Sequence, residues 1–146
     1  MRRFLWAAAA VMSAACSDTA APQSDKIDPV GTYSLQSIND KALPFILIEI
    51  SQSYSLYQTW GTLTLNANKT FIERDSVREV IVQSPSAQVR DTMVTITGTW
   101  LAEDDSVITL TQSNGGFLFG AARKMTMTLT YLASDNSAYT YLYLKK

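Results

Sequence analysis

Residues 124–132 read Lys-Met-Thr-Met-Thr-Leu-Thr-Tyr-Leu, and this stretch decides the fold class. Every second position holds a large apolar side chain and threonine fills the positions between: Met125, Met127, Leu129 and Tyr131. Successive side chains of a β-strand point to opposite faces, so this spacing predicts a strand with one apolar and one polar face. Threonine and tyrosine also favour extended backbone. The stretch therefore predicts a half-buried strand of an antiparallel sheet.

The same alternation of polar and large apolar residues continues from residue 30 to residue 146, with turn residues recurring every dozen or so positions. No long segment repeats its apolar residues at helical spacing. The pattern predicts eight strands, at 31–39, 47–58, 60–66, 70–82, 89–100, 106–112, 124–132 and 138–144. Short polar links favour antiparallel neighbours, hence an all-β meander that closes into an up-and-down barrel. A β-sandwich of two packed sheets is the alternative.

The chain of 146 residues has room for one folded domain, preceded by a processed leader. Residues 1–15 combine two arginines with a short alanine-rich apolar run, which is the plan of a signal peptide. The apolar run is too short to span a bilayer, which takes roughly 20 residues. Residues 16–29 are small and polar with two prolines, which is typical of a flexible tether. The barrel domain is predicted over 30–146.

Cys16 is the single cysteine of the chain and directly follows the small residues Ser13, Ala14 and Ala15. This arrangement resembles the lipobox of bacterial lipoproteins. The resemblance implies cleavage before Cys16, diacylation of its thiol and acylation of its new amino group. Several acyl chains on one residue give stable anchoring, whereas a single chain holds only marginally. Ser17 after the cysteine resembles the outer-membrane default of such proteins, so we expect an exported, lipid-anchored envelope protein that faces the periplasm.

Composition excludes several classes of function. The sequence contains no histidine and one cysteine, which excludes Ser–His and Cys–His nucleophile pairs and zinc sites built from His or Cys. A formal net charge of −1 provides no basic surface for nucleic acid. We therefore expect a monomer that is not an enzyme, with no catalytic residue, no cofactor and no metal site.

Three short stretches carry a family resemblance: 31–44, 61–68 and 98–100. The first runs from Gly31-Thr32-Tyr33 through a short turn into Leu43-Pro44, and the other two repeat Gly-Thr followed by a large apolar residue. They resemble the first and middle strands of small bacterial lipocalin-like lipoproteins over most of residues 30–112. The resemblance implies a calycin-type β-barrel, with or without a ligand cavity, and no catalytic residue.

Candidate ligand-binding residues come from two places. Trp100, Met125, Met127 and Tyr131 either line a cavity for an apolar ligand or form an ordinary core, and the ordinary core is the simpler interpretation. Phe117 and Phe119 belong to residues 114–120, where three glycines frame an apolar trio in a predicted loop. This loop is either a lid over a barrel mouth or a plug that folds into the core, and we favour the plug.

The strand predicted at 70–82 carries charges on both faces. Glu73, Asp75 and Glu79 alternate with Arg74 and Arg78. Charge pairing along an exposed strand accounts for this pattern better than acid–base chemistry on a sugar does. We therefore predict a long exposed strand, bent or at the rim of the barrel.

Two functional hypotheses follow from these observations. The first is a lipid-anchored, lipocalin-like protein that binds or carries a small apolar molecule or an envelope lipid without chemistry. The second is a filled barrel that acts as a structural or protein-interaction module of the envelope, with strand 70–82 and loop 114–120 as its contact surface. A hollow interior would favour the first hypothesis, and fold alone does not decide between them.

Overall fold

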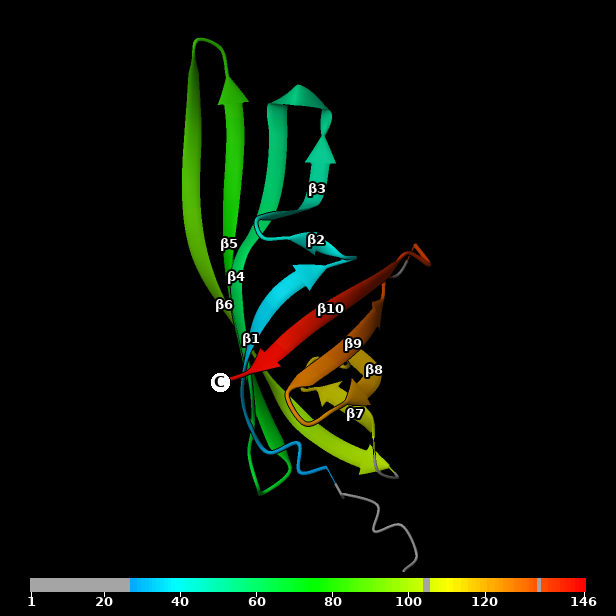
Figure 1. Ribbon diagram of the computed structural model, residues 1–146. Helices are drawn as coiled ribbons and strands as arrows, with labels where there is room; N and C mark the ends of the chain where they lie inside the picture. Colours follow the sequence, from blue (N-terminus) through cyan, green and yellow to red (C-terminus); the bar gives the residue numbers. More distant parts are fainter. Residues whose placement is uncertain (1–26, 104–105, 134) are drawn as a thin grey trace, which may run out of the picture.

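The computed structural model describes residues 27–103, 106–133 and 135–146. Over these residues the chain forms one antiparallel sheet of ten strands, drawn in Figure 1. The strands are β1 (Gly31–Ile38), β2 (Lys41–Ala42), β3 (Phe45–Ile50), β4 (Tyr54–Leu65), β5 (Thr70–Gln83), β6 (Ser86–Glu103), β7 (Val107–Gln112), β8 (Phe117–Ala122), β9 (Thr126–Leu132) and β10 (Ala138–Lys145). A single 3₁₀ turn, η1 (Ser51–Ser53), joins β3 to β4. No helix in this part of the chain is long and apolar enough to cross a membrane.

The sheet closes on itself as a barrel, as the meander pattern predicts. Strands β4 to β10 pair in sequence order, and β1 joins β10 on one side and β4 on the other. The ring therefore holds eight strands, while β2 and β3 lie outside it. The alternation in β9 has the expected result, because Met127 and Leu129 are fully buried while the threonines on either side of each are only half-buried.

The strand boundaries between residues 45 and 66 differ from the prediction. The predicted strand 47–58 is two strands, because η1 reverses the chain at Ser51–Ser53 and separates β3 from β4. The predicted break at residue 59 is instead a bulge inside β4, where the register with β5 shifts between Gln58 and Trp60. A bulge absorbs one extra residue without ending a strand, so β4 runs for 12 residues.

The predicted loop at 114–120 is also wrong. Only its first residues form a turn, and Phe117–Ala122 is strand β8, paired with β7 and β9. Gly120 explains the error, because a glycine inside a strand allows close backbone approach as well as flexibility. A Cβ atom at Gly120 would collide with the carbonyl oxygen of Thr128 on β9. The glycine thus lets β8 and β9 pack closely.

One end of the barrel is closed by the chain that leads into β1. Ile27 and Val30 pack against the core, and the Tyr33 hydroxyl donates a 2.8 Å hydrogen bond to the carbonyl oxygen of Pro29. Nearby, the buried Trp100 donates from Nε1 to the carbonyl oxygen of Asn66 at 3.0 Å, and the Lys69 Nζ lies 3.8 Å from the centre of its ring. A cation over an aromatic face is favourable.

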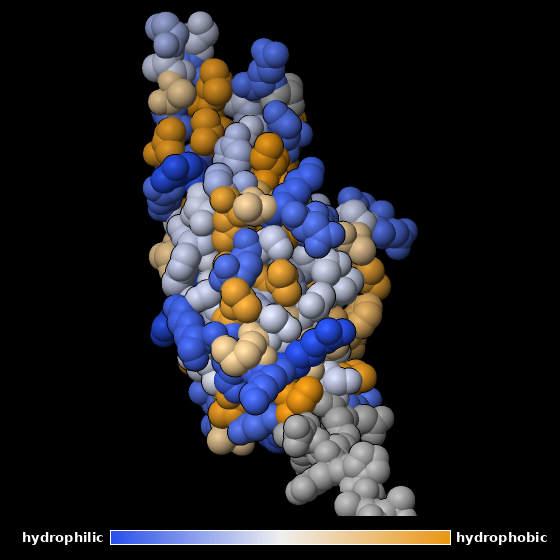
Figure 2. All heavy atoms as spheres, viewed as in Figure 1, coloured by the Kyte–Doolittle hydropathy of each residue, from blue (hydrophilic) through white to orange (hydrophobic). Residues whose placement is uncertain are grey.

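At the other end, β4, β5 and β6 continue past the barrel and β3 joins them in a projecting sheet, which we call the blade (Figure 1). The blade comprises β3, residues 54–58 of β4, 76–83 of β5 and 86–93 of β6. Figure 2 shows apolar side chains gathered on this part of the surface, and several are more than two-fifths exposed: Ile46, Ile48, Ile50, Val82, Val89 and Met93. Arg78 and Asp91 form an ion pair on the blade at 2.8 Å.

Candidate functional site

The interior of the barrel contains two carboxyl groups. Glu73 and Asp75 lie two residues apart on β5, so both point to the same face, and only 5% and 8% of their surfaces are exposed. The prediction of exposed, charge-paired acids is therefore wrong for these two. Arg74 and Arg78 lie on the opposite, outer face, and Arg78 pairs with Asp91 of β6. Glu73 and Asp75 point inward because they lie two and four residues after the buried Phe71, and every second side chain of a strand lies on the same face.

The two carboxyl groups differ in their hydrogen bonds. Tyr143 of β10 is fully buried, and its hydroxyl donates a 2.7 Å hydrogen bond to Glu73 Oε1. Asp75 Oδ1 accepts no hydrogen bond, and Gln58 Nε2 on the neighbouring strand donates none; these are the two unpaired buried side-chain atoms among the described residues. Buried polar groups are normally paired, so an unpaired carboxyl group on a residue that lines a cavity is a functional signal.

Burial raises the pKa of both carboxyl groups. The pKa of Asp75 rises to about 8, chiefly by desolvation and further by the charge of Glu73. The Gln58 amide opposes the shift because it lies near the carboxyl group, although its Nε2 atom does not reach hydrogen-bond geometry with Oδ1. Desolvation also raises the pKa of Glu73, and the hydrogen bond from Tyr143 opposes it. The pKa values of Tyr141 and Tyr143 rise through desolvation and the nearby acids. The neutral acid form of Asp75 therefore predominates at pH 7.

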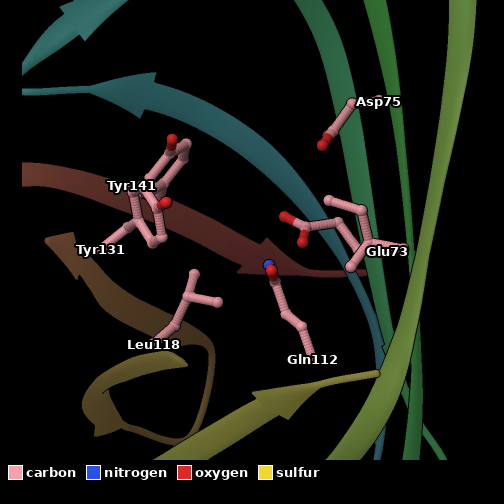
Figure 3. A pocket seen from close by; sticks show the side chains of 7 residues that line it. Glu73, Asp75, Gln112, Leu118, Tyr131 and Tyr141 are labelled. Atoms are coloured by element: carbon pink, nitrogen blue, oxygen red, sulfur yellow. The ribbon is translucent and has the colours of Figure 1, made fainter. Parts of the chain in front are cut away.

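A cavity of about 200 Å³ lies in front of these groups (Figure 3). Two carboxyl groups, two phenols, one amide and two aliphatic side chains line it: Glu73, Asp75, Tyr131, Tyr141, Gln112, Ile96 and Leu118. Figure 3 shows Glu73 and Asp75 reaching in from β5 toward Tyr131 and Tyr141. Gly61 pairs with Asp75 across β4 and β5, and a Cβ atom there would come within 2.6 Å of Asp75 Oδ1. The glycine leaves room for the carboxyl group.

A second hollow, of about 430 Å³, adjoins the turn before β8. Its lining is mainly apolar and aromatic: Gly115, Gly116, Phe117, Phe119, Tyr131 and Leu132. Phe117 and Phe119 lie about half-exposed on the outer face of β8, with their ring centres 6.2 Å apart. Tyr131 lines both this hollow and the interior cavity.

The structure separates the six residues that the sequence singles out for ligand binding. Tyr131 reaches the interior cavity, and Phe117 and Phe119 share the outer hollow with it. Trp100 and Met127 are buried in the core and line neither of these spaces, while Met125 is 55% exposed just before β9. Residues 1–15, Cys16 and the tether up to residue 26 lie outside the described residues.

Sequence reasoning missed the polar part of the cavity, although one signal for it is present. Glu73 and Asp75 continue the alternation that begins with the apolar Phe71, which places them on the inward face of the strand. Gln112 and Tyr141 carry no comparable signal, because their position at the cavity follows from how β7 and β10 are placed in the sheet.

Comparison with protein-family models, with curated proteins and with solved structures finds no match for this chain. Within the described residues, no group of three or more Cys, Asp or Glu side chains is placed to hold a metal ion. The geometry and chemistry of the cavity are therefore the observations from which the function of this protein is inferred.

Proposed function

We propose that this protein is a lipid-anchored, lipocalin-like binding protein of the bacterial envelope that encloses a small molecule in its barrel without chemistry. One observation carries the proposal: the barrel contains a cavity of about 200 Å³ that is lined by the buried carboxyl groups of Glu73 and Asp75, and Asp75 has an oxygen atom without a hydrogen-bond partner. A pocket that combines apolar walls with a few convergent polar groups is the usual form of a small-molecule site.

The size of the cavity limits the ligand. A volume of about 200 Å³ is roughly seven times the ~30 Å³ share of one liquid water, and it lies below the ~300–1,000 Å³ of pockets for drug-sized ligands. The polar lining also disfavours a purely apolar occupant, because the carboxyl groups would lose solvent and gain no partner. Both features favour a compact molecule with a polar group over the long acyl chain of an envelope lipid.

Anchoring through Cys16 fits the orientation of the barrel. The chain enters the described structure at the closed end, and the blade projects from the opposite end (Figure 1). A lipid on Cys16 and a tether over 17–29 would therefore join the domain to the membrane from its closed end. The blade and the cavity side of the barrel would then face the periplasm.

Native mass spectrometry of the full chain, extracted from its own envelope in mild detergent, tests the proposal. A Leu118→Phe variant fills the cavity, and Leu101→Phe makes the same change at a position that is 53% exposed. We expect the unmodified chain and Leu101→Phe to carry an added small mass that is lost on collisional activation, and Leu118→Phe to lack it. Ile96→Phe serves as a second filling variant if Leu118→Phe fails to fold, as far-ultraviolet circular dichroism would show.

A bare chain mass for the unmodified protein, unchanged after incubation with a small-molecule extract of the envelope, would contradict the proposal. Retention of the added mass by both filling variants would contradict its location in the barrel.

The exposed apolar side chains of the blade favour a second candidate function, contact with an envelope protein. Val89 and Met93 are 59% and 55% exposed, and β3 is the last strand of its sheet, so its outer edge is open to another strand. A photo-crosslinking residue placed at position 89 in cells tests this function. A discrete protein adduct from position 89, and none from position 101 on the barrel, would support it; equal labelling from both would exclude it.

A further inference from the structure

We propose that the cavity recognises a small organic cation, a primary amine with a compact apolar body, whose ammonium group sits between Glu73 and Asp75. The inference rests on the proposed function and names the class of its ligand. It starts from Asp75, which is more than nine-tenths buried, points into the cavity and has an oxygen atom without a hydrogen-bond donor.

The charge around the cavity favours a cation. The lining contains two acids and no lysine or arginine, and the two arginines of β5 lie on its outer face. An ammonium group has three donors and no acceptor, so it can donate to the carboxyl groups of Asp75 and Glu73 at once. Charge-assisted hydrogen bonds of this kind are stronger than neutral ones.

The rest of the lining suits an apolar body of limited size. Tyr131 and Tyr141 stand across the cavity from the acids, and the face of a phenol ring attracts a cation. Ile96 and Leu118 supply aliphatic contact. A cavity of about 200 Å³ has room for one ring or a short branched chain beside the ammonium group.

Proton release should accompany the binding of an amine. In the free protein desolvation raises the pKa of Asp75 to about 8, and a neighbouring cation stabilises the carboxylate and lowers that pKa. The polar groups that face Asp75 are Glu73 on its own strand, Gln58 on β4, Tyr131 on β9, and Tyr141 and Tyr143 on β10. None of them is cationic. The next charged side chains along this face, Glu79 and Arg90, stand opposite each other in the blade.

Isothermal titration calorimetry of the full chain in detergent, at pH 7.5, tests this inference with two probes of nearly equal shape. The probes are 2-phenylethylamine and 2-phenylethanol, which differ in the amine and hydroxyl group. We expect the amine to bind at least about tenfold more tightly, because hydrogen bonds to charged groups are worth more than neutral ones. Asp75→Asn keeps the shape of the side chain and should remove that preference, while the matched change Asp91→Asn on the exposed face of the blade should not.

Titration in two buffers with different ionisation enthalpies gives a second readout that a structural role would not move. We expect up to about one proton to leave for each amine bound to the unmodified protein, and fewer for Asp75→Asn, since one of the two buried acids is then absent. An equal affinity for the two probes, or amine binding without proton release, would overturn the inference.

The two proposals fail in distinguishable ways. If native mass spectrometry finds a molecule that Leu118→Phe excludes, but the amine shows no preference over the alcohol, only the cation inference is wrong. If neither probe binds and no molecule accompanies the chain, the proposed function is wrong and the inference falls with it.

Discussion

At the scale of single residues, the proposed function depends on the two acids of β5, Glu73 and Asp75, which line the cavity. A protein interior normally excludes a carboxyl group unless it is paired, because removing the charge from water is costly. Glu73 meets this requirement through Tyr143, which is 70 residues away in the sequence. Asp75 does not meet it, because its Oδ1 atom has no partner. In the free protein burial raises the pKa of Asp75 to about 8, so the group is mostly neutral at pH 7 and the cost of burying a charge is reduced.

The buried Asp75 should make the stability of the free protein fall as pH rises. Its pKa is raised from about 3.8 to about 8, so the folded state retains a proton that the unfolded state releases over this range. The contribution of Asp75 to the free energy of unfolding is then fully present below about pH 4. It declines toward pH 8, at up to about 1.4 kcal/mol per pH unit for one such group. Urea unfolding at pH 5.5 and pH 8.5 should show this decline and a shallower one for Asp75→Asn. Parallel declines for the two proteins would contradict the burial of an ionisable Asp75.

Loss of the Tyr143 hydroxyl should destabilise the barrel by about 1–3 kcal/mol, because Glu73 Oε1 then loses its hydrogen-bond donor. Burial raises the pKa of Glu73, and the cost should grow with pH as the group ionises, since a carboxylate accepts a stronger hydrogen bond than a neutral acid does. Tyr33→Phe is the matched control, because it removes a buried hydroxyl that donates to the uncharged carbonyl of Pro29. Urea unfolding of both variants should show a pH-dependent cost for Tyr143→Phe alone, and an equal pH dependence would refute the pairing.

At the scale of strands, glycines set how closely neighbours approach. Gly98 and Gly120 each occupy a position where a Cβ atom would collide with a backbone carbonyl oxygen, of Thr111 and Thr128 respectively. Backbone cannot move aside as a side chain can, so these contacts fix the spacing of β6 against β7 and of β8 against β9. The blade differs, because beyond residue 76 the strands leave the barrel and no longer enclose a core.

Gly120→Ala should therefore cost about 3 kcal/mol of stability, through overpacking against Thr128. Gly116→Ala is the matched control, because the new methyl group would meet the end of the flexible Gln112 side chain, which can rotate away. Thermal unfolding should show a large loss for the first variant and a small one for the second. Equal losses would mean that backbone approach does not govern the spacing of β8 and β9.

Strand prediction from sequence succeeds here where alternation is clean and fails where a local signal has two meanings. Alternating threonine and large apolar residues predict β9, and the same period predicts β5, β6 and β10 within a few residues. The glycines around β8 indicate a loop as readily as a tight strand contact, so that strand is missed. At the cavity, Tyr131 is predicted, whereas Gln112 is brought toward the acids by the pairing of β7 with β6 and of β6 with β5. Tyr141 meets the acids only through the closure of β1 against β4 and β10. No local pattern encodes that closure.

At the scale of the whole molecule, the barrel has two unlike ends. The closed end is sealed by the segment before β1 and by Trp100 with Asn66, whereas the other end carries the blade. Phe45 packs edge-on against Tyr139 with ring centres 6.4 Å apart, which links β3 to β10 across the ring of strands. The proposed anchor at Cys16 would reach the membrane from the closed end and leave the rest of the surface accessible.

Cys16→Ala should release the protein from the membrane into the soluble fraction, because the proposed lipid is then absent and a chain with a formal net charge of −1 has no net attraction to anionic lipid. Cell fractionation with antibody detection measures this, and Ser17→Ala is the matched control that leaves the cysteine in place. A Cys16→Ala variant that remains in the membrane fraction after a high-salt wash would refute the lipoprotein hypothesis.

Nuclear magnetic resonance of the ¹⁵N-labelled full chain, recorded with and without the small molecule that accompanies it, shows whether the ligand binds inside the barrel. We expect binding to shift the backbone resonances of the cavity residues Asp75, Gln112, Leu118, Tyr131 and Tyr141, and to leave those of the blade near Val82 and Val89 unchanged. Shifts confined to the blade would contradict binding inside the barrel and would move the function of this protein from the interior of the barrel to its projecting sheet.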